Sequence, residues 1–330
     1  MRLLFIGGTG NISSACVELA LERGHEVTLL NRGRSASPFG SRVEVIVGDR
    51  DDPALLKETA TARRYEAVVD FVAYEPGQVE AAIGAFAGRV GQYVFISSAA
   101  VYLRPSSQPM TTEAAPLGNP FWEYGRKKIA CEERLLRARG KQALPVTIVR
   151  PSYTYGPTWI PSAVGGHDYT LVDRIRRGQP IISHGDGTSF WVMTFHTDFA
   201  LGLVGLLGNP QALGEAVHIT SDEVRTWDQI YQTSARAAGH EAQLVHVPSD
   251  LIAALWPERA GSLLGDKAHS AIFDNGKIKR LVPEYRATVS FAEGIARSVA
   301  WFDADPARRT VSDDANRAID RIIAAQRRAF

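Results

Sequence analysis

The chain has 330 residues, of which 45% are hydrophobic and 22% charged, the composition of an ordinary globular protein. Its 37 basic and 36 acidic side chains nearly balance, which excludes a general electrostatic attraction to nucleic acids or membrane surfaces. The two cysteines are too few for a disulfide framework. Because the start has no secretion-signal pattern and no apolar run can span a bilayer, we expect a cytoplasmic protein without a membrane segment.

Short apolar runs alternate with helical stretches in the first half of the chain. Residues 12–23 have apolar positions at helical spacing and predict a helix. Runs rich in β-branched and aromatic residues predict strands at 3–6, 26–30, 43–47, 67–71, 93–96 and 147–149. Continuous apolar strands separated by helices are typical of a parallel sheet covered on both faces. The predicted fold class is therefore α/β, with a doubly wound Rossmann-type sheet.

The pattern changes after about residue 155, where prolines and glycines become frequent and the alternation stops. We expect residues 1–155 to form a dinucleotide-binding domain and 156–330 mainly a smaller substrate-binding lobe. Segments near 196–220 are expected to return to the first domain. The tail, 313–330, predicts a charged amphipathic helix.

A glycine-rich turn, GGTGNIS at residues 7–13, follows the first predicted strand and opens the first predicted helix. Glycines let a backbone approach a pyrophosphate closely, and a helix N-terminus offers N–H groups and the positive end of a dipole. A tight turn alone would also explain the run. Its place at the first strand–helix junction favours a dinucleotide site that includes Gly7, Thr9, Gly10, Asn11 and Ile12.

The second predicted strand ends in Asn31, Arg32 and Arg34, with no acidic residue. NAD sites usually carry an acid there that binds the adenosine ribose, whereas two guanidiniums suit a 2′-phosphate. The alternative is a solvated basic turn in which Asn31 binds an unphosphorylated ribose. We favour NADP as the cofactor, with NAD as the alternative.

Two further strand ends are candidates for cofactor contact. Asp49 and Arg50 follow the third strand, where the adenine edge is expected. Phe71, Val72 and Ala73 follow the fourth, where the chain should pass under the cofactor. All of them are equally consistent with ordinary strand-end residues.

The octet FWEYGRKK places Tyr124 and Lys128 one helical turn apart, about 20 residues after Ser98 in the stretch SSAAVY. Together with the glycine turn and a Tyr-Gly-Pro at 155–157, these motifs resemble the extended short-chain dehydrogenase/reductase superfamily, in its atypical, NAD-dependent epimerase/dehydratase-like part. The resemblance implies that Tyr124 is the acid/base, Lys128 its partner and Ser98 the hydroxyl that holds the substrate oxygen. It also implies that Tyr124, Lys128 and Pro151 contact the cofactor.

A tyrosine phenol has a pKa near 10, roughly three units too high for a base at neutral pH. A positive charge about 4 Å away contributes on the order of the 4 kcal/mol required. Lys128 and an oxidised nicotinamide together are expected to lower the pKa of Tyr124. The alternatives are a packed tyrosine beside a solvated lysine, and a serine that only completes a turn.

Departures from the family pattern bear on the substrate. Dehydratases of the superfamily place Asp-Glu where this chain has Ala99-Ala100, which disfavours 4,6-dehydration. Nucleotide-sugar members carry diphosphate-binding Asn and Arg residues where this chain has Tyr153 and Trp191. Flat aromatic faces suit a sugar ring or another aromatic group. We therefore expect a sugar, sugar acid or polyol without a nucleotide, although Trp191 is equally explained as a core residue and a nucleotide-sugar substrate stays open.

The remaining expectations concern ligands and partners. His167 is a candidate for lining the substrate pocket, and the spacing of the histidines predicts no metal site. Epimerase and oxidoreductase activities require the same residues, so the sequence does not separate them. Two stretches at 31–34 and 48–53 look similar to chloroplast stem-loop RNA-binding proteins, which makes a non-catalytic RNA-binding protein the alternative. By analogy with relatives, a homodimer is possible.

Overall fold

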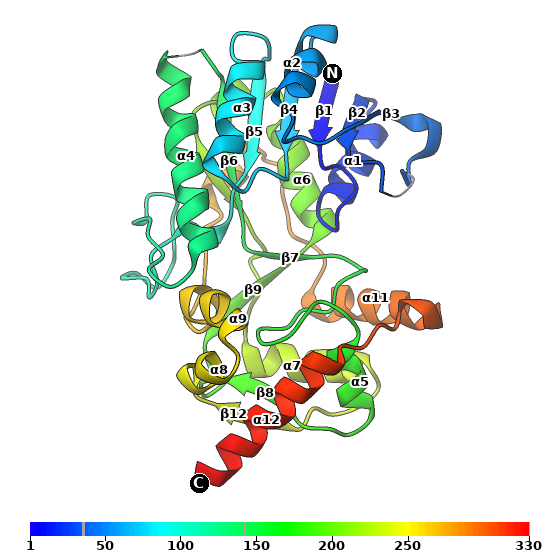
Figure 1. The fold of residues 1–330 in the computed structure, drawn as a ribbon, viewed down its shortest axis with the longest axis vertical. Coiled ribbons are helices and arrows are strands. Elements are labelled where there is room, and N and C mark those ends of the chain that lie inside the picture. The colour runs from blue at the N-terminus through cyan, green and yellow to red at the C-terminus, as the bar shows by residue number, and fades with distance from the viewer. Residues whose placement is uncertain (35–36, 142, 330) are drawn as a thin grey trace.

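Seven parallel strands form the central sheet of the computed structural model, which describes residues 1–34, 37–141 and 143–329 (Figure 1). Their spatial order is β10-β6-β5-β4-β1-β2-β3. The strands are β1 (Arg2–Ile6), β2 (Glu26–Asn31), β3 (Glu44–Val47), β4 (Ala67–Asp70), β5 (Gln92–Ile96), β6 (Val146–Pro151) and β10 (Ala216–Ile219). Each predicted strand of the first half is present within a few residues, and the predicted doubly wound α/β fold is confirmed.

Helices cover both faces of this sheet. They are α1 (Ser13–Glu22) and α6 (His196–Leu206) on one face, and α2 (Pro53–Ala62), α3 (Pro76–Phe86) and α4 (Glu123–Lys141) on the other. Successive residues of a strand point to opposite faces, so Leu3 and Phe5 pack with α1 and α6 while Leu4 and Ile6 pack with the other three helices. This two-sided burial explains why the strands are continuously apolar in the sequence.

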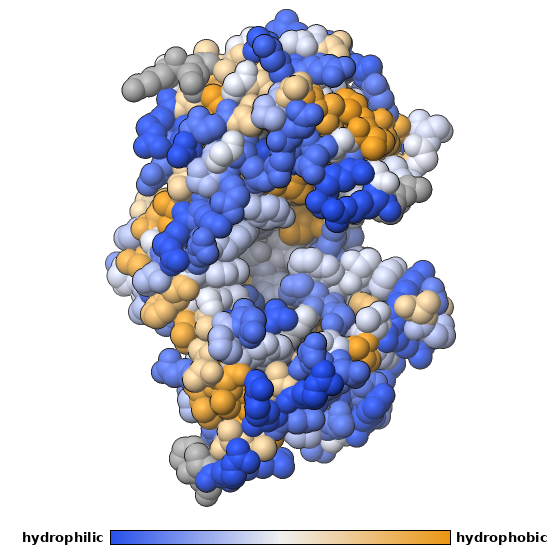
Figure 2. Space-filling model, in the orientation of Figure 1, coloured by the Kyte–Doolittle hydropathy of each residue, from blue (hydrophilic) through white to orange (hydrophobic). Residues whose placement is uncertain are grey.

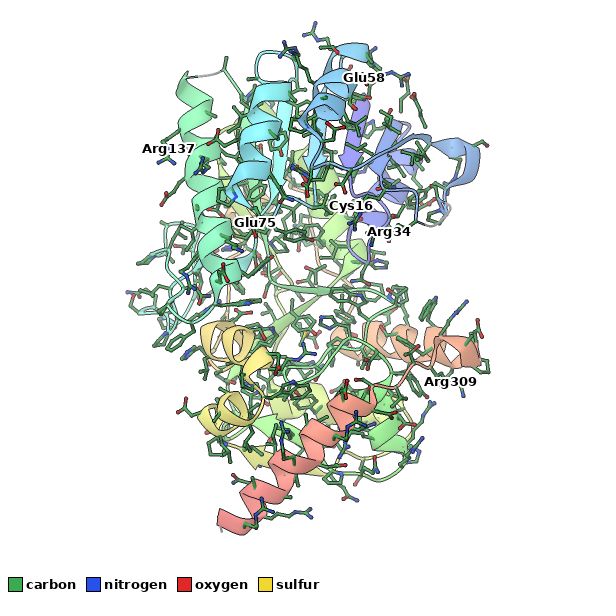
Figure 3. All side chains as sticks on the ribbon, viewed as in Figure 1. Cys16, Arg34, Glu58, Glu75, Arg137 and Arg309 are labelled. Atoms are coloured by element: carbon green, nitrogen blue, oxygen red, sulfur yellow. The ribbon has the colours of Figure 1, made fainter. Side chains whose placement is uncertain are left out.

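Local signals set where these helices begin. The carboxylate of Asp52 caps α2 by accepting the N–H of Ala54 at 2.9 Å, and Pro53 takes the first helical position. Glu75 is likewise the N-cap residue of α3, and Pro76 takes the first helical position. Glu75 also binds the ammonium of Lys127 at 2.7 Å, which joins the start of α3 to α4 (Figure 3).

The second lobe contains two small sheets and several helices. Its strands are β7 (Tyr153–Tyr155), β9 (Phe190–Phe195) and β11 (Val224–Thr226) in one sheet, and β8 (Ile181–His184) and β12 (Leu244–Val247) in the other. Its helices are α5 (Thr170–Arg176), α7 (Trp227–Ala237), α8 (Ser249–Leu255), α9 (Pro257–Ser262), the π-helix η4 (Leu263–Lys267), α11 (Phe291–Asp303) and α12 (Asp313–Ala329). A further helix, α10 (Gly276–Leu281), contributes Ile278 to the core beside α6. Four short 3₁₀ turns connect elements: η1 (Gly40–Arg42), η2 (Ala99–Val101), η3 (Pro210–Ala212) and η5 (Pro306–Arg308).

The arrangement of the two parts positions the functional site. The carboxyl ends of the seven parallel strands point toward the second lobe (Figure 1), and the space-filling surface is hollowed between the two parts (Figure 2). In open α/β sheets, ligands bind outside the carboxyl ends of the strands. Across the described ranges, no helix has both the length and the apolar character that a membrane crossing requires.

Candidate active site

A groove of about 380 Å³ lies at the carboxyl ends of β1, β2, β3 and β4. Its lining residues are Gly7, Thr9, Gly10, Leu30, Asn31, Arg32, Gly33, Arg34, Gly48, Asp49, Arg50, Asp51, Val72, Tyr74 and Gln78. The groove thus brings together nine of the predicted cofactor residues from four separate strand ends. Its place at the glycine turn and the start of α1 is where a dinucleotide binds in this fold class.

The glycine at the end of β1 is required by the backbone. Gly7 has φ of +83°, and a Cβ at this position would lie 2.6 Å from Val72 Cγ1. Only glycine adopts this conformation readily and leaves room for the neighbouring strand end. The close approach of the two strand ends forms the floor of the groove.

Asn11 connects the glycine turn to the second lobe. Its side-chain oxygen accepts a hydrogen bond from Thr158 Oγ1 at 3.1 Å, and its backbone oxygen lies 3.0 Å from His196 Nδ1. Its Nδ2 is buried and has no hydrogen-bond partner in the part of the chain that is described. A buried amide donor of this kind is satisfied when an acceptor such as a phosphate or ribose oxygen binds beside it, so the residues fit a dinucleotide.

Arg32 and Arg34 are both exposed at the end of β2. Figure 3 shows Arg34 at the edge of the first domain that faces the second lobe. Asn31, half-buried, ends the strand, and no carboxylate occupies the strand end itself. The exposed guanidiniums of Arg32 and Arg34 can bind an anionic group on the adenosine ribose.

Arg50 differs from its expected role. Its guanidinium is buried and donates to Asp70 Oδ2 at 2.6 Å and to the carbonyl of Gln78 at 3.1 Å. Asp70 also accepts from the Tyr93 hydroxyl at 2.8 Å. Arg50 therefore ties the end of β3 to β4 and α3 while it lines the groove, and the exposed Asp49 lies next to it.

Four other predicted cofactor residues lie outside the lining of the groove. Phe71 stacks on Phe5 at 6.3 Å, and Ile12 packs against the core under α1. Pro151 ends β6 beside Ile219 of β10. Ala73 is buried, and it reaches the site through its carbonyl oxygen, which binds Lys128.

The structure brings Ser98, Tyr124 and Lys128 together next to this groove. Ser98 follows β5, and Tyr124 and Lys128 stand on the first turns of α4. The Ser98 hydroxyl accepts from the N–H of Ala100 at 3.1 Å and lies near enough to Tyr124 to affect the pKa of its phenol. The ring of Tyr124 lies 6.4 Å from that of Tyr74, which lines the groove. Lys128 is 1% exposed, and its ammonium donates to the carbonyl oxygens of Ala73 at 2.7 Å and Ile96 at 2.8 Å.

Burial dominates the electrostatics of Tyr124 and Lys128. Burial raises the pKa of Tyr124 well above its ordinary value, and the nearby Ser98 hydroxyl offsets this only in part. The same burial lowers the pKa of Lys128 to about 8. The Lys128 ammonium is directed to two carbonyls and lies 5.8 Å from the centre of the Tyr124 ring, so it does not by itself make the phenol more acidic.

A buried ionic network that the sequence did not reveal supports these residues. Glu132, one turn after Lys128, accepts from Arg150 Nη2 at 2.6 Å and from Ser97 Oγ at 2.5 Å. Arg150 also donates to the Tyr102 hydroxyl at 3.2 Å. The network joins α4, β6 and the end of β5 directly behind Ser98. The only sequence signal is helical spacing between Lys128 and Glu132, which many surface helices share.

The predicted substrate residues separate into two groups. The Tyr153 hydroxyl lies 3.0 Å from His167 Nδ1, and the His167 ring stacks on Trp159 at 4.1 Å. Burial lowers the pKa of His167 to about 4, so this imidazole is neutral at physiological pH. Trp191, by contrast, is 2% exposed in the core against Trp227, and its ring presents no face to a ligand.

Two side chains near the site were missed by the sequence reasoning. The Trp122 ring lies 4.7 Å from that of Tyr124, and the Lys267 ammonium lies 5.5 Å from the Trp122 ring and 5.8 Å from the Tyr153 ring. Lys267 comes from the second lobe, far along the chain, and no local motif marks it. Within residues 1–34, 37–141 and 143–329, no three His, Cys, Asp or Glu side chains are placed to hold a metal ion.

Comparison with known proteins agrees with this geometry. The model of the NAD dependent epimerase/dehydratase family matches residues 3–220. The 2′-dehydrokanamycin reductase of Streptomyces kanamyceticus is 27% identical over 287 residues, which cover 87% of this chain and 80% of that protein. The chloroplast stem-loop binding protein of 41 kDa b from Arabidopsis thaliana is 29% identical over 264 residues, 74% of this chain and 65% of that protein.

A solved structure shows the same fold. The UDP-glucose 4-epimerase from Bifidobacterium longum, in complex with NAD+ and UDP, superposes with a TM-score of 0.74 at 18% identity, over 93% of this chain and 99% of that chain. The resemblance drawn from the sequence motifs is confirmed by the family match. The chain belongs to the NAD dependent epimerase/dehydratase family and is an enzyme of its oxidoreductase type, like the NAD-dependent epimerases, dehydratases and reductases related to it.

Proposed function

We propose that the protein transfers a hydride at a carbinol or carbonyl carbon of a sugar or sugar-derived substrate that carries no nucleotide. The observation that carries this proposal is the placement of Tyr124 near Ser98, whose hydroxyl acts to lower the pKa of the phenol, beside the groove that Tyr74 lines. A single transfer makes the enzyme a dehydrogenase or reductase. Two transfers, with the intermediate turned over between them, make it an epimerase with the same residues.

Tyr124 is the group that exchanges a proton with the substrate oxygen. Because burial raises the pKa of its phenol, the hydroxyl is protonated at neutral pH and can donate to a carbonyl oxygen. Ser98 holds the same oxygen through a second hydrogen bond. When bound, the nicotinamide supplies or accepts the hydride, and its oxidised ring carries a positive charge that favours the phenolate in the oxidative direction.

Lys128 has a positioning role and an electrostatic role. Its hydrogen bonds to Ala73 and Ile96 hold two adjacent strand ends at a fixed distance from α4, and thereby from Tyr124. Its charge is directed at these carbonyls and not at the phenol, so its electrostatic effect on Tyr124 acts together with that of an oxidised nicotinamide. This arrangement supports the proton exchange assigned to Tyr124.

The absence of a nucleotide from the substrate is proposed on two grounds. Tyr153 stands where nucleotide-sugar members have a diphosphate-binding amide, and its hydroxyl is engaged by Ser162 and His167. The related reductase from Streptomyces kanamyceticus is named for 2′-dehydrokanamycin, a name that contains no nucleotide. A nucleotide-sugar 4-epimerase or reductase is the alternative. Strong thermal protection by UDP or GDP would favour that alternative.

NADP is proposed as the preferred cofactor because Arg32 and Arg34 are exposed on the rim of the groove. In a fluorescence titration, NADPH should bind at least tenfold more tightly than NADH. The double variant Arg32→Ala/Arg34→Ala should remove that preference and leave NADH affinity unchanged. A tenfold preference of the unmodified protein for NADH would refute the proposal.

The test of the proposed reaction is a screen of sugars and sugar acids with each cofactor, followed by nicotinamide absorbance and product stereochemistry. With a substrate found in this way, Tyr124→Phe should lower kcat by roughly 10²–10⁴-fold while dinucleotide binding is retained. The matched control is Tyr65→Phe, which removes the hydroxyl of another buried tyrosine far from the site and should leave kcat unchanged. A Tyr124→Phe variant with unchanged kcat would refute this mechanism.

A stem-loop RNA-binding function is the second candidate, because a relative at 29% identity is named a stem-loop binding protein. The net charge of +1 argues against a large contribution from phosphate contacts. Micromolar RNA affinity that falls steeply with salt would support this candidate.

A cytoplasmic location and a homodimer are further proposals. The two cysteines, Cys16 and Cys131, are both buried and free, as is usual in a reducing compartment. Of the apolar residues along α4, Leu135 is in the core and Leu136 is 44% exposed. Leu136→Glu should convert a dimer formed through α4 into a monomer in light-scattering measurements.

A further inference from the structure

Lys267 ends the π-helix η4 in the second lobe and lies over two aromatic rings of the candidate site. Its ammonium is 5.5 Å from the centre of the Trp122 ring and 5.8 Å from that of the Tyr153 ring. The Trp122 ring is in turn 4.7 Å from the ring of Tyr124. The positive charge is therefore separated from the proposed acid/base by a single aromatic side chain. Short π-helical segments are frequent at functional sites.

The π-helix is held tightly in this position. The carbonyl of Gly265 accepts a hydrogen bond from Asn119 Nδ2 at 2.9 Å, and the same amide donates to the carbonyl of Ala100, two residues after Ser98. A Cβ on Gly265 would lie 2.9 Å from Trp122 Cβ, so the two segments leave no room for a side chain between them. The position of Lys267 is thus set by contacts of η4 with the segment after Ser98, through Asn119, and with Trp122, which precedes Tyr124.

The charge of Lys267 is poorly compensated. The side chain is 12% exposed, and within the described ranges its ammonium has one ion pair, with Asp266 at 3.9 Å, which is longer than a hydrogen bond. Arg104, 4% exposed, is a second buried cation near Asp266. Its Nη1 donates to the carbonyl of Ser270 at 3.1 Å, and within the described residues its Nε and Nη2 are buried without partners. Arg259 adds a further repulsive charge, and burial together with Arg259 lowers the pKa of Lys267.

Buried cations are normally paired and hydrogen-bonded. Aromatic faces attract an ammonium but accept none of its three hydrogen bonds in the directional way that an oxyanion does. One carboxylate near two buried cations leaves an excess of positive charge close to Trp122 and Tyr153. The missing partner is then an anion that arrives with the substrate.

We propose that Lys267 binds an oxyanion of the substrate, so that the enzyme selects a sugar-like substrate that carries a carboxylate or a phosphate ester. This proposal rests on the proposed function, because it places the anion next to the carbon that Tyr124 and Ser98 serve. Trp122 and Tyr153 supply flat walls for the ring of the substrate, and Lys267 fixes which end of that ring faces the second lobe. A carboxylate and a phosphate ester both present an anionic oxygen that can accept hydrogen bonds from the Lys267 ammonium.

The test measures the binding of three probes to the protein loaded with NADP+: D-glucuronate, glucose 1-phosphate and neutral D-glucose, each by calorimetry. At least one acidic probe should bind tenfold or more tightly than D-glucose, and the stronger of the two identifies the oxyanion. Lys267→Met should weaken the acidic probe at least tenfold and leave D-glucose unchanged, while Lys267→Arg should retain most of the difference. The matched control, Lys279→Met, removes a partly exposed lysine on α10 that is paired with Asp222 and should leave the affinities of all three probes unchanged.

Equal affinity for acidic and neutral probes, no binding of either acid, or a preference that survives in Lys267→Met would each overturn the proposal. The outcome is separable from that of the proposed reaction. Charge-selective binding that depends on Lys267, without any redox change or epimerised product, would leave the anion site standing and remove the reaction. Turnover of neutral sugars that depends on Tyr124 and is unaffected in Lys267→Met would support the proposed reaction and refute the anion site.

Discussion

The buried ammonium of Lys128 makes a sharp prediction about stability and pH. Its pKa is lowered from 10.5 to about 8, with burial as the main cause. Below pH 8 the lysine is protonated in both the folded and the unfolded chain, and the folded state carries the full cost of the buried charge. Between pH 8 and 10.5 the folded chain releases this proton while the unfolded chain keeps it, so stability rises with pH across that window.

The size of the effect follows from the two pKa values. A fall from 10.5 to about 8 corresponds to roughly 3 kcal/mol at low pH. Linkage assigns about 2 kcal/mol of that to the interval between pH 7.0 and 9.5. Every other titrating group contributes as well, so the contribution of Lys128 is isolated by comparison with Lys128→Met, in which the charge is absent.

The assay is urea unfolding at pH 7.0 and pH 9.5, without cofactor, for the unmodified protein and the variant. The change in unfolding free energy between the two pH values should be more positive in the unmodified protein by about 2 kcal/mol. Lys57→Met, which removes an exposed lysine on α2, should behave like the unmodified protein. Parallel pH profiles for Lys128→Met and the unmodified protein would show that the ammonium is not desolvated as the structure indicates.

Two further predictions concern the floor of the groove and the network behind it. Gly7→Ala should cost about 1–3 kcal/mol, because its φ is +83° and its Cβ would lie 2.6 Å from Val72, and it should weaken dinucleotide binding in a fluorescence titration. Glu132→Gln should cost about 3–5 kcal/mol in urea unfolding, since it leaves the Arg150 guanidinium buried without a counter-ion. The double variant Glu132→Gln/Arg150→Met should recover part of that loss, and a double variant less stable than Glu132→Gln alone would contradict the reasoning.

The comparison between expectation and structure is clearest at the strand ends. Asn31, Arg32 and Arg34 lie on the rim of the groove because the position of a residue at the end of a buried parallel strand is fixed by the sheet itself. Arg50 has the same kind of position in the sequence, yet its side chain turns inward to Asp70. The difference depends on a carboxylate 20 residues away, which no local pattern can indicate.

Trp191 illustrates the same limit in the second lobe. Its alignment with a diphosphate-binding position favoured the site and its size favoured the core, and these two readings could not be separated by sequence. The structure packs it under Trp227, where burial of its large apolar surface contributes most.

By itself, the sequence determined the doubly wound fold, the glycine turn and the pair Tyr124 and Lys128, because each depends on periodicity or spacing within one or two elements. Only the tertiary structure decided the protonation of these groups and the arrival of Lys267 beside Trp122. Burial and long-range charge depend on which segments meet across the two lobes. Lys128 meets Ala73 and Ile96, which are 55 and 32 positions away, and Lys267 meets Trp122 from still farther along the chain, so no periodic signal marks these contacts.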